Sequence, residues 1–190
     1  MSTELLDLSR ALPSGEHRAC LGLGSNVDPV SNLRRAIRKL RRAVTVEAVS
    51  RAWESPAVGG DGPDYTNAAL LVRTPQSKEW LMARLTEIEN ELGRARNHRR
   101  PARLTIDIDM LLFDQEFLED DLWSQAYRAV PVAELLPDLC CPSTGESLSH
   151  TATRLAGSSP IRSCPENLAG SLRTGTSQTN PTSSTRTRTP

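Results

Sequence analysis

The chain has 190 residues and a formal net charge of zero, so composition gives no electrostatic case for binding nucleic acid or an anionic membrane. No apolar run is long enough to span a bilayer, and residues 1–17 lack the basic lead and apolar run of a secretory signal. The four cysteines form no C-x-x-C pair and no zinc-ligand spacing. We therefore expect a cytoplasmic protein, and we expect it to be a monomer.

The apolar residues are distributed unevenly along the chain. From residue 157 onward large apolar side chains are almost absent, and Ser, Thr and Arg dominate the end of the sequence. Such a segment cannot bury enough surface to offset its ordering entropy. We predict a flexible N-terminal extension at 1–17, one core domain at 18–156 and a disordered tail at 157–190.

The first predicted elements are a strand and a helix. Residues 19–24 form a short apolar run that ends at a Gly-Ser-Asn turn, which is typical of a buried strand. Ser31 is a suitable N-cap for the helix that follows. The apolar residues of this helix recur at helical spacing, at Leu33, Ala36, Ile37 and Leu40. Its other face is basic, which a solvated surface explains without a ligand.

The remaining pattern completes a known strand and helix order. We predict strands at 44–52, 67–74 and 104–113, a loop at 55–63, a helix from the N-cap Ser77 to Gly93, and a short helix at 132–136. The order over about a hundred residues is β-α-β-β-α-β, the split arrangement of ferredoxin-like domains. The sequence therefore predicts an α+β fold, with an antiparallel sheet and helices packed on one face.

An acidic pair lies on the strongest predicted strand. Asp107 and Asp109 are two residues apart, so an extended backbone directs both carboxylates to one face, and Ile106, Ile108 and Met110 to the core. Adjacent like charges are costly unless a cation lies between them, and Mg²⁺ prefers carboxylate and phosphate oxygens. A bare D-x-D is more often a solvated polar face.

Two neighbouring features favour the functional interpretation of this pair. A basic loop at 94–103 directly precedes the strand and suits phosphate groups, although arginines after a helix can also simply complement its dipole. Tyr65 and Asn67 share a face at the start of a strand, where a ring to stack on and an amide suit a flat heterocycle. An ordinary turn with a core tyrosine is the alternative.

These pieces resemble, in this order, the 6-hydroxymethyl-7,8-dihydropterin pyrophosphokinase family of folate biosynthesis. The resemblance covers roughly residues 19–139. Its motifs are L-G-S-N at 23–26, W-E-S-P-A-V-G at 53–59, G-P-D-Y-T-N-A-A at 62–69, I-E-N-E-L-G-R-A-R at 88–96, D-I-D-M-L-L-F at 107–113 and P-V-A-E-L-L-P at 131–137. Each motif alone is weak, but together at compatible spacing they are strong.

The resemblance implies a ferredoxin-like enzyme that takes ATP with two Mg²⁺ ions and a pterin, and that releases AMP. It implies metal ligands at Asp107 and Asp109, which with Arg94 and Arg103 form the expected catalytic set. It places near ATP the residues Glu89, Arg94, Arg96, Arg103 and Met110. It places around the pterin the residues Ser55, Pro56, Val58, Tyr65, Asn67 and Tyr127.

The sequence also departs from the family's pattern. Counted back from Asp107, the family's arginine position holds Leu104, and Arg103 is one residue early, which on a regular strand turns it to the wrong face. Glu119 and Gln125 occupy positions where the family usually has His and Arg, so phosphate-binding charge is missing. The neighbouring Arg128 could substitute, but on a strand it faces away from Tyr127.

Three alternatives stay open beside the enzyme. The first is a catalytically weakened or inactive relative that binds pterin or nucleotide without turnover. The second is an RNA-binding module, since the same strand order supports one, but residues 19–24 and 104–108 carry no stacking aromatics. The third is a structural domain, which the joint occurrence of the motifs disfavours.

Overall fold

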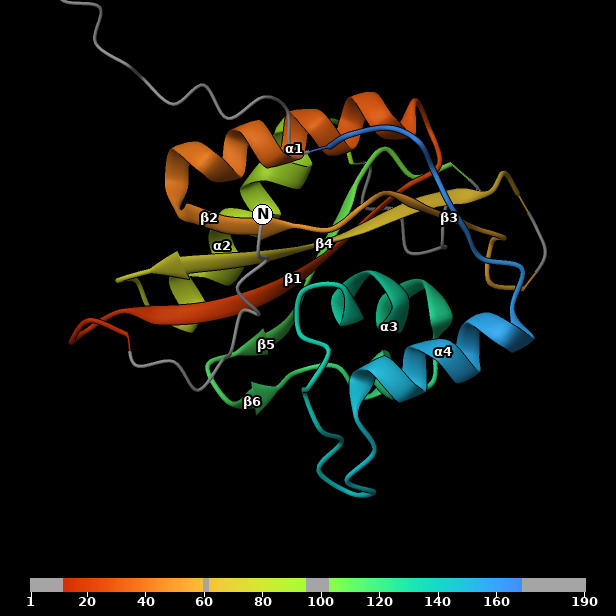
Figure 1. Cartoon of the computed structure of the whole chain (residues 1–190). Coiled ribbons are helices and arrows are strands. Elements are labelled where there is room, and N and C mark those ends of the chain that lie inside the picture. The colour runs from red at the N-terminus through yellow and green to blue at the C-terminus, as the bar shows by residue number, and fades with distance from the viewer. Residues whose placement is uncertain (1–11, 60–61, 95–102, 169–190) are drawn as a thin grey trace, which may run out of the picture.

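The computed structural model describes residues 12–59, 62–94 and 103–168, and Figure 1 shows how its helices and strands are arranged. The elements are β1 (His17–Ser25), α1 (Pro29–Ala43), β2 (Thr45–Val49), β3 (Trp53–Ser55), β4 (Tyr65–Thr74), α2 (Lys78–Glu91), β5 (Asp107–Phe113), β6 (Glu116–Phe117), η1 (Asp120–Trp123), α3 (Ala126–Ala133), α4 (Leu148–Ser158) and β7 (Arg162–Ser163). Each described helix is too short or too polar to cross a lipid bilayer.

Seven strands form one sheet in the order β6-β5-β1-β4-β3-β7, and β2 pairs with a further part of β4. Neighbouring strands are antiparallel throughout. The long strand β1 lies between β5 and β4, while β2 and β3 share the other edge of β4. This is the strand arrangement expected of a split βαβ unit, so the α+β, ferredoxin-like prediction is confirmed.

The predicted strand at 44–52 is divided into two in the structure. β2 ends at Val49 and β3 begins at Trp53. Between them, the N–H of Ser50 donates to the carbonyl of Ala69 at 2.9 Å, while the Ser50 Oγ accepts from the Ala69 N–H at 2.8 Å. A side-chain oxygen thus takes the place of a backbone carbonyl, and the ladder is interrupted there.

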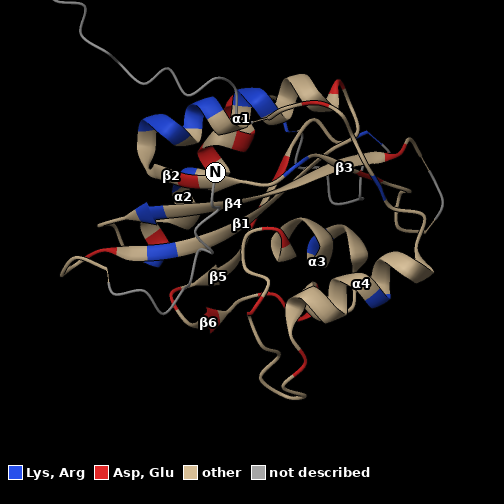
Figure 2. Cartoon of the chain, viewed as in Figure 1, with Lys and Arg blue, Asp and Glu red and all other residues tan. Residues whose placement is uncertain are grey.

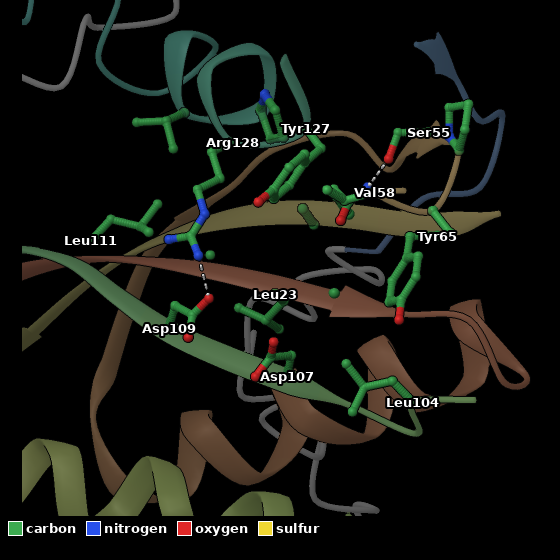
Figure 3. Close-up of a pocket in the computed structure, with 18 of the residues that line it drawn as sticks. Leu23, Ser55, Val58, Tyr65, Leu104, Asp107, Asp109, Leu111, Tyr127 and Arg128 are labelled. Atoms are coloured by element: carbon green, nitrogen blue, oxygen red, sulfur yellow. Dashed lines mark hydrogen bonds and ion pairs between the residues drawn. The ribbon is translucent and has the colours of Figure 1, made fainter. Parts of the chain in front are cut away.

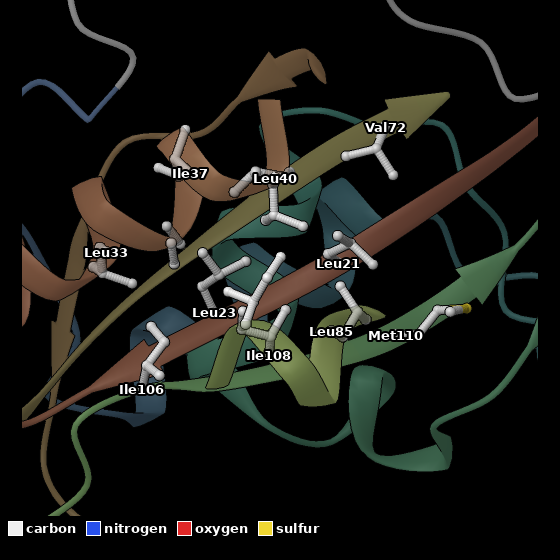
Figure 4. Packing of buried hydrophobic residues seen from close by; sticks show 14 of the residues in the cluster. Leu21, Leu23, Leu33, Ile37, Leu40, Val72, Leu85, Ile106, Ile108 and Met110 are labelled. Carbon is white, nitrogen blue, oxygen red and sulfur yellow. The ribbon is translucent and has the colours of Figure 1, made fainter. Parts of the chain in front are cut away.

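The helices α1 and α2 cover one face of the sheet, and Figure 4 shows their buried side chains packed on β1, β4 and β5. Figure 2 shows the basic residues of α1 on its outer side, as expected for a solvated face. The N-cap of α2 is Ser77 as predicted, since its side chain accepts from the Trp80 N–H at 3.3 Å. For α1 the prediction is wrong: the helix begins at Pro29, which suits a first turn, and Asp28 is its N-cap.

A second pair of helices, α3 and α4, covers the opposite face of the sheet. The sequence prediction placed helices on one face only and a short helix at 132–136, whereas α3 spans Ala126–Ala133. In α4, Leu148, Ala152 and Leu155 recur at helical spacing and are buried against α3 and the sheet. This added layer forms one wall of the site described below.

The fold continues past the predicted domain end at Ala156. The strand β7 pairs with β3, and the Cys164 N–H donates to the carbonyl of Ala52 at 2.8 Å. Leu168 is only 4% exposed and joins the core under α1. At least twelve residues of the predicted tail, 157–168, therefore belong to the fold. Residues 1–11 and 169–190 lie outside the described part, and all four cysteines are free.

Candidate functional site

A cavity of about 520 Å³ lies between α3, the segment after β3, and the strands β1, β4 and β5, and Figure 3 shows the side chains around it. This volume suits a small-molecule ligand. All the residues predicted to hold a pterin line it, namely Ser55, Pro56, Val58, Tyr65, Asn67 and Tyr127. Arg94, Asp107 and Asp109 line the same cavity, so the structure brings both groups of predicted residues together.

The acidic pair of β5 faces the cavity because residues two apart on a strand point to the same face of the sheet. Asp107 and Asp109 point into the cavity, whereas Ile108 between them is buried under α1 and α2. In the β1–β5 ladder, Asp107 is paired with Gly24 and Asp109 with Gly22. Directly paired residues share a face of the sheet. The space above each glycine is taken by a cavity-lining side chain, Leu111 at Gly22 and Asn67 at Gly24, so the glycines let these side chains approach the strand beside the two carboxylates.

Arg94 bridges the end of α2 to the acidic pair. Its Nη1 lies 2.5 Å from Asp107 Oδ1 and also forms an ion pair with Glu89 Oε1. The same Glu89 oxygen accepts from the Ile108 N–H at 2.8 Å, and Glu89 is 3% exposed. Predicted to lie near ATP, Glu89 is instead buried behind the cavity wall. It positions Arg94 and the start of β5.

Arg128 is a second cation in the cavity, which the sequence reasoning set aside. Its Nη2 donates to Asp109 Oδ2 at 2.9 Å, as Figure 3 shows. The argument from strand alternation was wrong because residues 126–133 form the helix α3, on which neighbouring side chains need not point in opposite directions. A usable signal was present, since Ala126, Ala129 and Val130 recur at helical spacing and are buried.

Negative charge dominates this end of the cavity. Burial raises the pKa of Asp109 to about 6, the charge of Asp107 adds to the effect, and Arg128 opposes it. Burial likewise raises the pKa of Glu89, although Ile108 and Arg94 act against this. A carboxylate held at such an elevated pKa is stabilised by an additional nearby cation.

The other end of the cavity is aromatic and amide-rich. The Asn67 Nδ2 donates to Ser55 Oγ at 3.0 Å, which leaves its Oδ1 as an acceptor. A Cβ on Gly24 would lie 3.3 Å from that Oδ1, so any larger residue at this position would crowd the amide. Tyr65 and Tyr127 line the cavity from β4 and α3. A flat heterocycle with donor groups along one edge fits these residues.

Arg103 and Met110, two further residues predicted to lie near ATP, do not line the cavity. Arg103 is exposed, and Leu104 lines the cavity in its place, as the one-residue displacement in the sequence indicated. Leu104 is held there by Asn26, whose Oδ1 accepts from the Leu104 N–H at 2.5 Å. The Met110 side chain is buried in the core, on the face opposite the acidic pair. Arg96 lies outside the described residues.

The fold and this cavity define a ferredoxin-like α+β protein with a ligand site that is acidic at one end and aromatic at the other. A family model described as 7,8-dihydro-6-hydroxymethylpterin-pyrophosphokinase (HPPK) matches residues 20–137. The match covers more than half of the chain and includes both ends of the cavity. The chain belongs to this family.

Curated relatives agree with the family model. The chain is 32% identical to the 2-amino-4-hydroxy-6-hydroxymethyldihydropteridine pyrophosphokinase of Synechocystis sp., over 72% of this chain and 75% of the relative. It is 35% identical to the protein of that name from Bacillus subtilis, over 72% of this chain and 89% of the relative. The similarity thus spans most of each relative.

Solved structures support the fold. A crystal structure described as Plasmodium falciparum HPPK-DHPS wild type with pterin and p-hydroxybenzoate matches with a TM-score of 0.61 at 10% identity. The match covers 80% of this chain but 45% of that longer one. At this identity the likeness concerns the fold alone.

Proposed function

We propose that this protein transfers the diphosphate of Mg·ATP to 6-hydroxymethyl-7,8-dihydropterin, giving the pterin diphosphate and AMP in folate biosynthesis. One observation carries the proposal: the acidic pair with its arginines, and the aromatic end with its amide, open into the same cavity. A triphosphate and a pterin bound at these two ends would meet inside it. Membership of the pyrophosphokinase family supports this substrate pair.

Asp107 and Asp109 are suited to hold Mg²⁺, and we expect two ions. Among the described residues, the buried Oδ1 of Asp107 has no hydrogen-bond partner, and its contact with Arg94 is an ion pair. No group of three or more acidic, His or Cys ligands gathers in the part of the chain that the structure describes. Two carboxylates with substrate phosphates as further ligands are a common Mg²⁺ arrangement. When bound, the metal would neutralise phosphate charge.

The protein's own groups contribute mainly by positioning. Arg94 and Arg128 would hold the phosphate chain, because guanidinium donors match phosphate oxygens. Tyr65 and Tyr127 would bracket the pterin, and Asn67 would accept from its donor edge. The pterin hydroxymethyl oxygen then attacks the β-phosphorus of ATP, its proton is lost to solvent, and AMP leaves. Alignment of reacting groups and charge stabilisation supply most catalysis in such transfers.

A catalytically weakened or inactive relative is the second candidate function. The observation in its favour is Glu119, whose Oε2 lies 3.6 Å from Arg128 Nη1 at the acidic end. A carboxylate there repels ATP phosphates and engages a cation that could bind them. Gln125, the N-cap of α3, provides no charge to compensate.

An AMP assay separates the two functions. Purified protein with Mg·ATP should release AMP only when 6-hydroxymethyl-7,8-dihydropterin is added. Asp107→Asn should abolish this release, while the same change at the exposed Asp138 should leave it intact. Pterin binding without AMP release by the wild type would favour the inactive relative.

We also propose that the protein acts as a monomer in the cytoplasm. The need for ATP suits the cytoplasm. A molecular mass measured in solution near 20.8 kDa would support the monomer, and twice that mass would refute it.

A further inference from the structure

The guanidinium of Arg128 contacts three carboxylates at the cavity wall, and Figure 3 shows the contact with Asp109. Its side chain comes from α3 and is 14% exposed. Its Nη2 lies 2.9 Å from Asp109 Oδ2, its Nε 3.2 Å from Asp121 Oδ1, and its Nη1 3.6 Å from Glu119 Oε2. One cation therefore faces three carboxylates, which come from β5, η1 and the segment between β6 and η1.

The three carboxylates around Arg128 lie on different sides of the cavity. Asp121 and Glu119 belong to the same side of the cavity as α3, and η1 packs against α3. Asp109 lies across the cavity on β5 and belongs to the acidic pair. The contact with Asp109 can therefore break while the other two still hold the guanidinium in place.

The Arg128–Asp109 contact occupies an oxygen that a metal would use. Among the described residues that line the cavity, Arg94 and Arg128 are the cationic ones, and each is engaged with one member of the acidic pair. A lone pair of Asp109 Oδ2 that accepts from Arg128 is not available to a metal at the same moment. Other lone pairs of the carboxylate stay open, but the charge of Arg128 repels a cation placed beside them, so Arg128 and a divalent cation compete for Asp109.

Among the described residues, one guanidinium nitrogen of Arg128 has no hydrogen-bond acceptor, although the Tyr127 side chain also interacts with the guanidinium. This nitrogen, Nη1, is buried, and its 3.6 Å contact with Glu119 is too long for a hydrogen bond. An unmatched charged donor in a cavity wall is costly. Phosphate oxygens, which accept paired guanidinium donors, would relieve that cost.

We propose that Arg128 exchanges partners when substrate binds. In the free protein it neutralises Asp109, and when the metal–ATP complex enters, it releases Asp109 and donates to phosphate oxygens of ATP. Asp121 and Glu119 retain the guanidinium at the wall, so a short swing of the side chain is enough. This exchange rests on the diphosphate transfer proposed above.

Two binding measurements test the exchange because it predicts changes of opposite sign. Mn²⁺ binding to nucleotide-free protein is followed by electron paramagnetic resonance, and binding of α,β-methylene-ATP with Mg²⁺ by calorimetry. Arg128→Met removes the competitor for Asp109, so Mn²⁺ should bind roughly fivefold more tightly at an alkaline pH at which Asp109 stays ionised without Arg128. The same variant should bind the nucleotide analogue about 10- to 100-fold more weakly. Arg154→Met, at an exposed arginine of α4, is the matched control and should change neither.

A purely structural role for Arg128 gives a different result. It predicts that both affinities fall together, and that outcome, or no change in either, would overturn the exchange. If Arg128→Met does not fold, Arg128→Lys is measured instead. The exchange predicts that this variant binds the nucleotide analogue more weakly and binds Mn²⁺ as tightly as the wild type or more tightly. Loss of both affinities would contradict the exchange. Wild-type protein that makes no AMP would refute the diphosphate transfer, whereas AMP release with unaltered binding by Arg128→Met would refute the exchange alone.

Discussion

The charge of Asp109 should destabilise the metal-free protein at neutral pH. The pKa of this carboxyl rises from 3.8 to about 6 in the fold. A group with a raised folded-state pKa contributes stability that is complete below its unfolded pKa and is lost as pH rises through its folded value. A difference of about two in pKa corresponds to at most about 3 kcal/mol. Because the side chain is 37% exposed, solvent screening reduces this to about 1 kcal/mol.

Asp109→Asn removes the charge and with it this pH dependence. The free energy of unfolding is measured by urea unfolding in EDTA for the wild type and the variant. The wild-type value minus the variant value should fall by about 1 kcal/mol between about pH 4 and about pH 8. Asp138→Asn, the same change at an exposed position, is the control and shows how much an Asp-to-Asn change alone alters the pH dependence of unfolding. If the difference between wild type and Asp109→Asn is constant or grows with pH, the electrostatic account of the acidic end is wrong.

Three further substitutions test how the site is held. Glu89→Ala should lower the free energy of unfolding by about 2 kcal/mol, because a buried N–H at the start of β5 loses its acceptor, and urea unfolding within about 0.5 kcal/mol of wild type would contradict this. Glu134→Ala should lower the free energy of unfolding by about 1 kcal/mol, because the Trp53 Nε1–H loses its acceptor, Glu134 Oε1, 3.0 Å away. An unchanged unfolding midpoint would show that this hydrogen bond does not stabilise the fold. Gly24→Ala should weaken pterin binding several-fold by crowding Asn67 Oδ1 at 3.3 Å, and calorimetry showing wild-type pterin affinity would refute the crowding.

Local signals were sufficient for the central part of the fold. The strand β5 and the helix α2 each carry a regular apolar pattern, and Ser77 caps α2 as its position in the sequence indicates. The β-α-β-β-α-β order of the elements from β1 to β5 also agrees with the prediction. Elements that owe their existence to packing were missed. The strand β7 has two residues and forms because it pairs with β3, which no local pattern reveals.

The site was predictable where neighbours in sequence are neighbours in space. Asp107 and Asp109 share a face through strand alternation alone, and Tyr65 and Asn67 do so on β4. Arg128 required knowledge that α3 is a helix and that it lies across the cavity from β5, which is a tertiary fact. The positions of residues outside the described ranges stay predictions.

Transfer of an intact diphosphate is the central claim, and ATP labelled with radioactive phosphorus at the β position tests it most directly. With Mg²⁺ and 6-hydroxymethyl-7,8-dihydropterin present, the label should appear in the pterin product while unlabelled AMP accumulates in equal amount. Label recovered in ADP or in inorganic phosphate, with none on the pterin, would contradict the account.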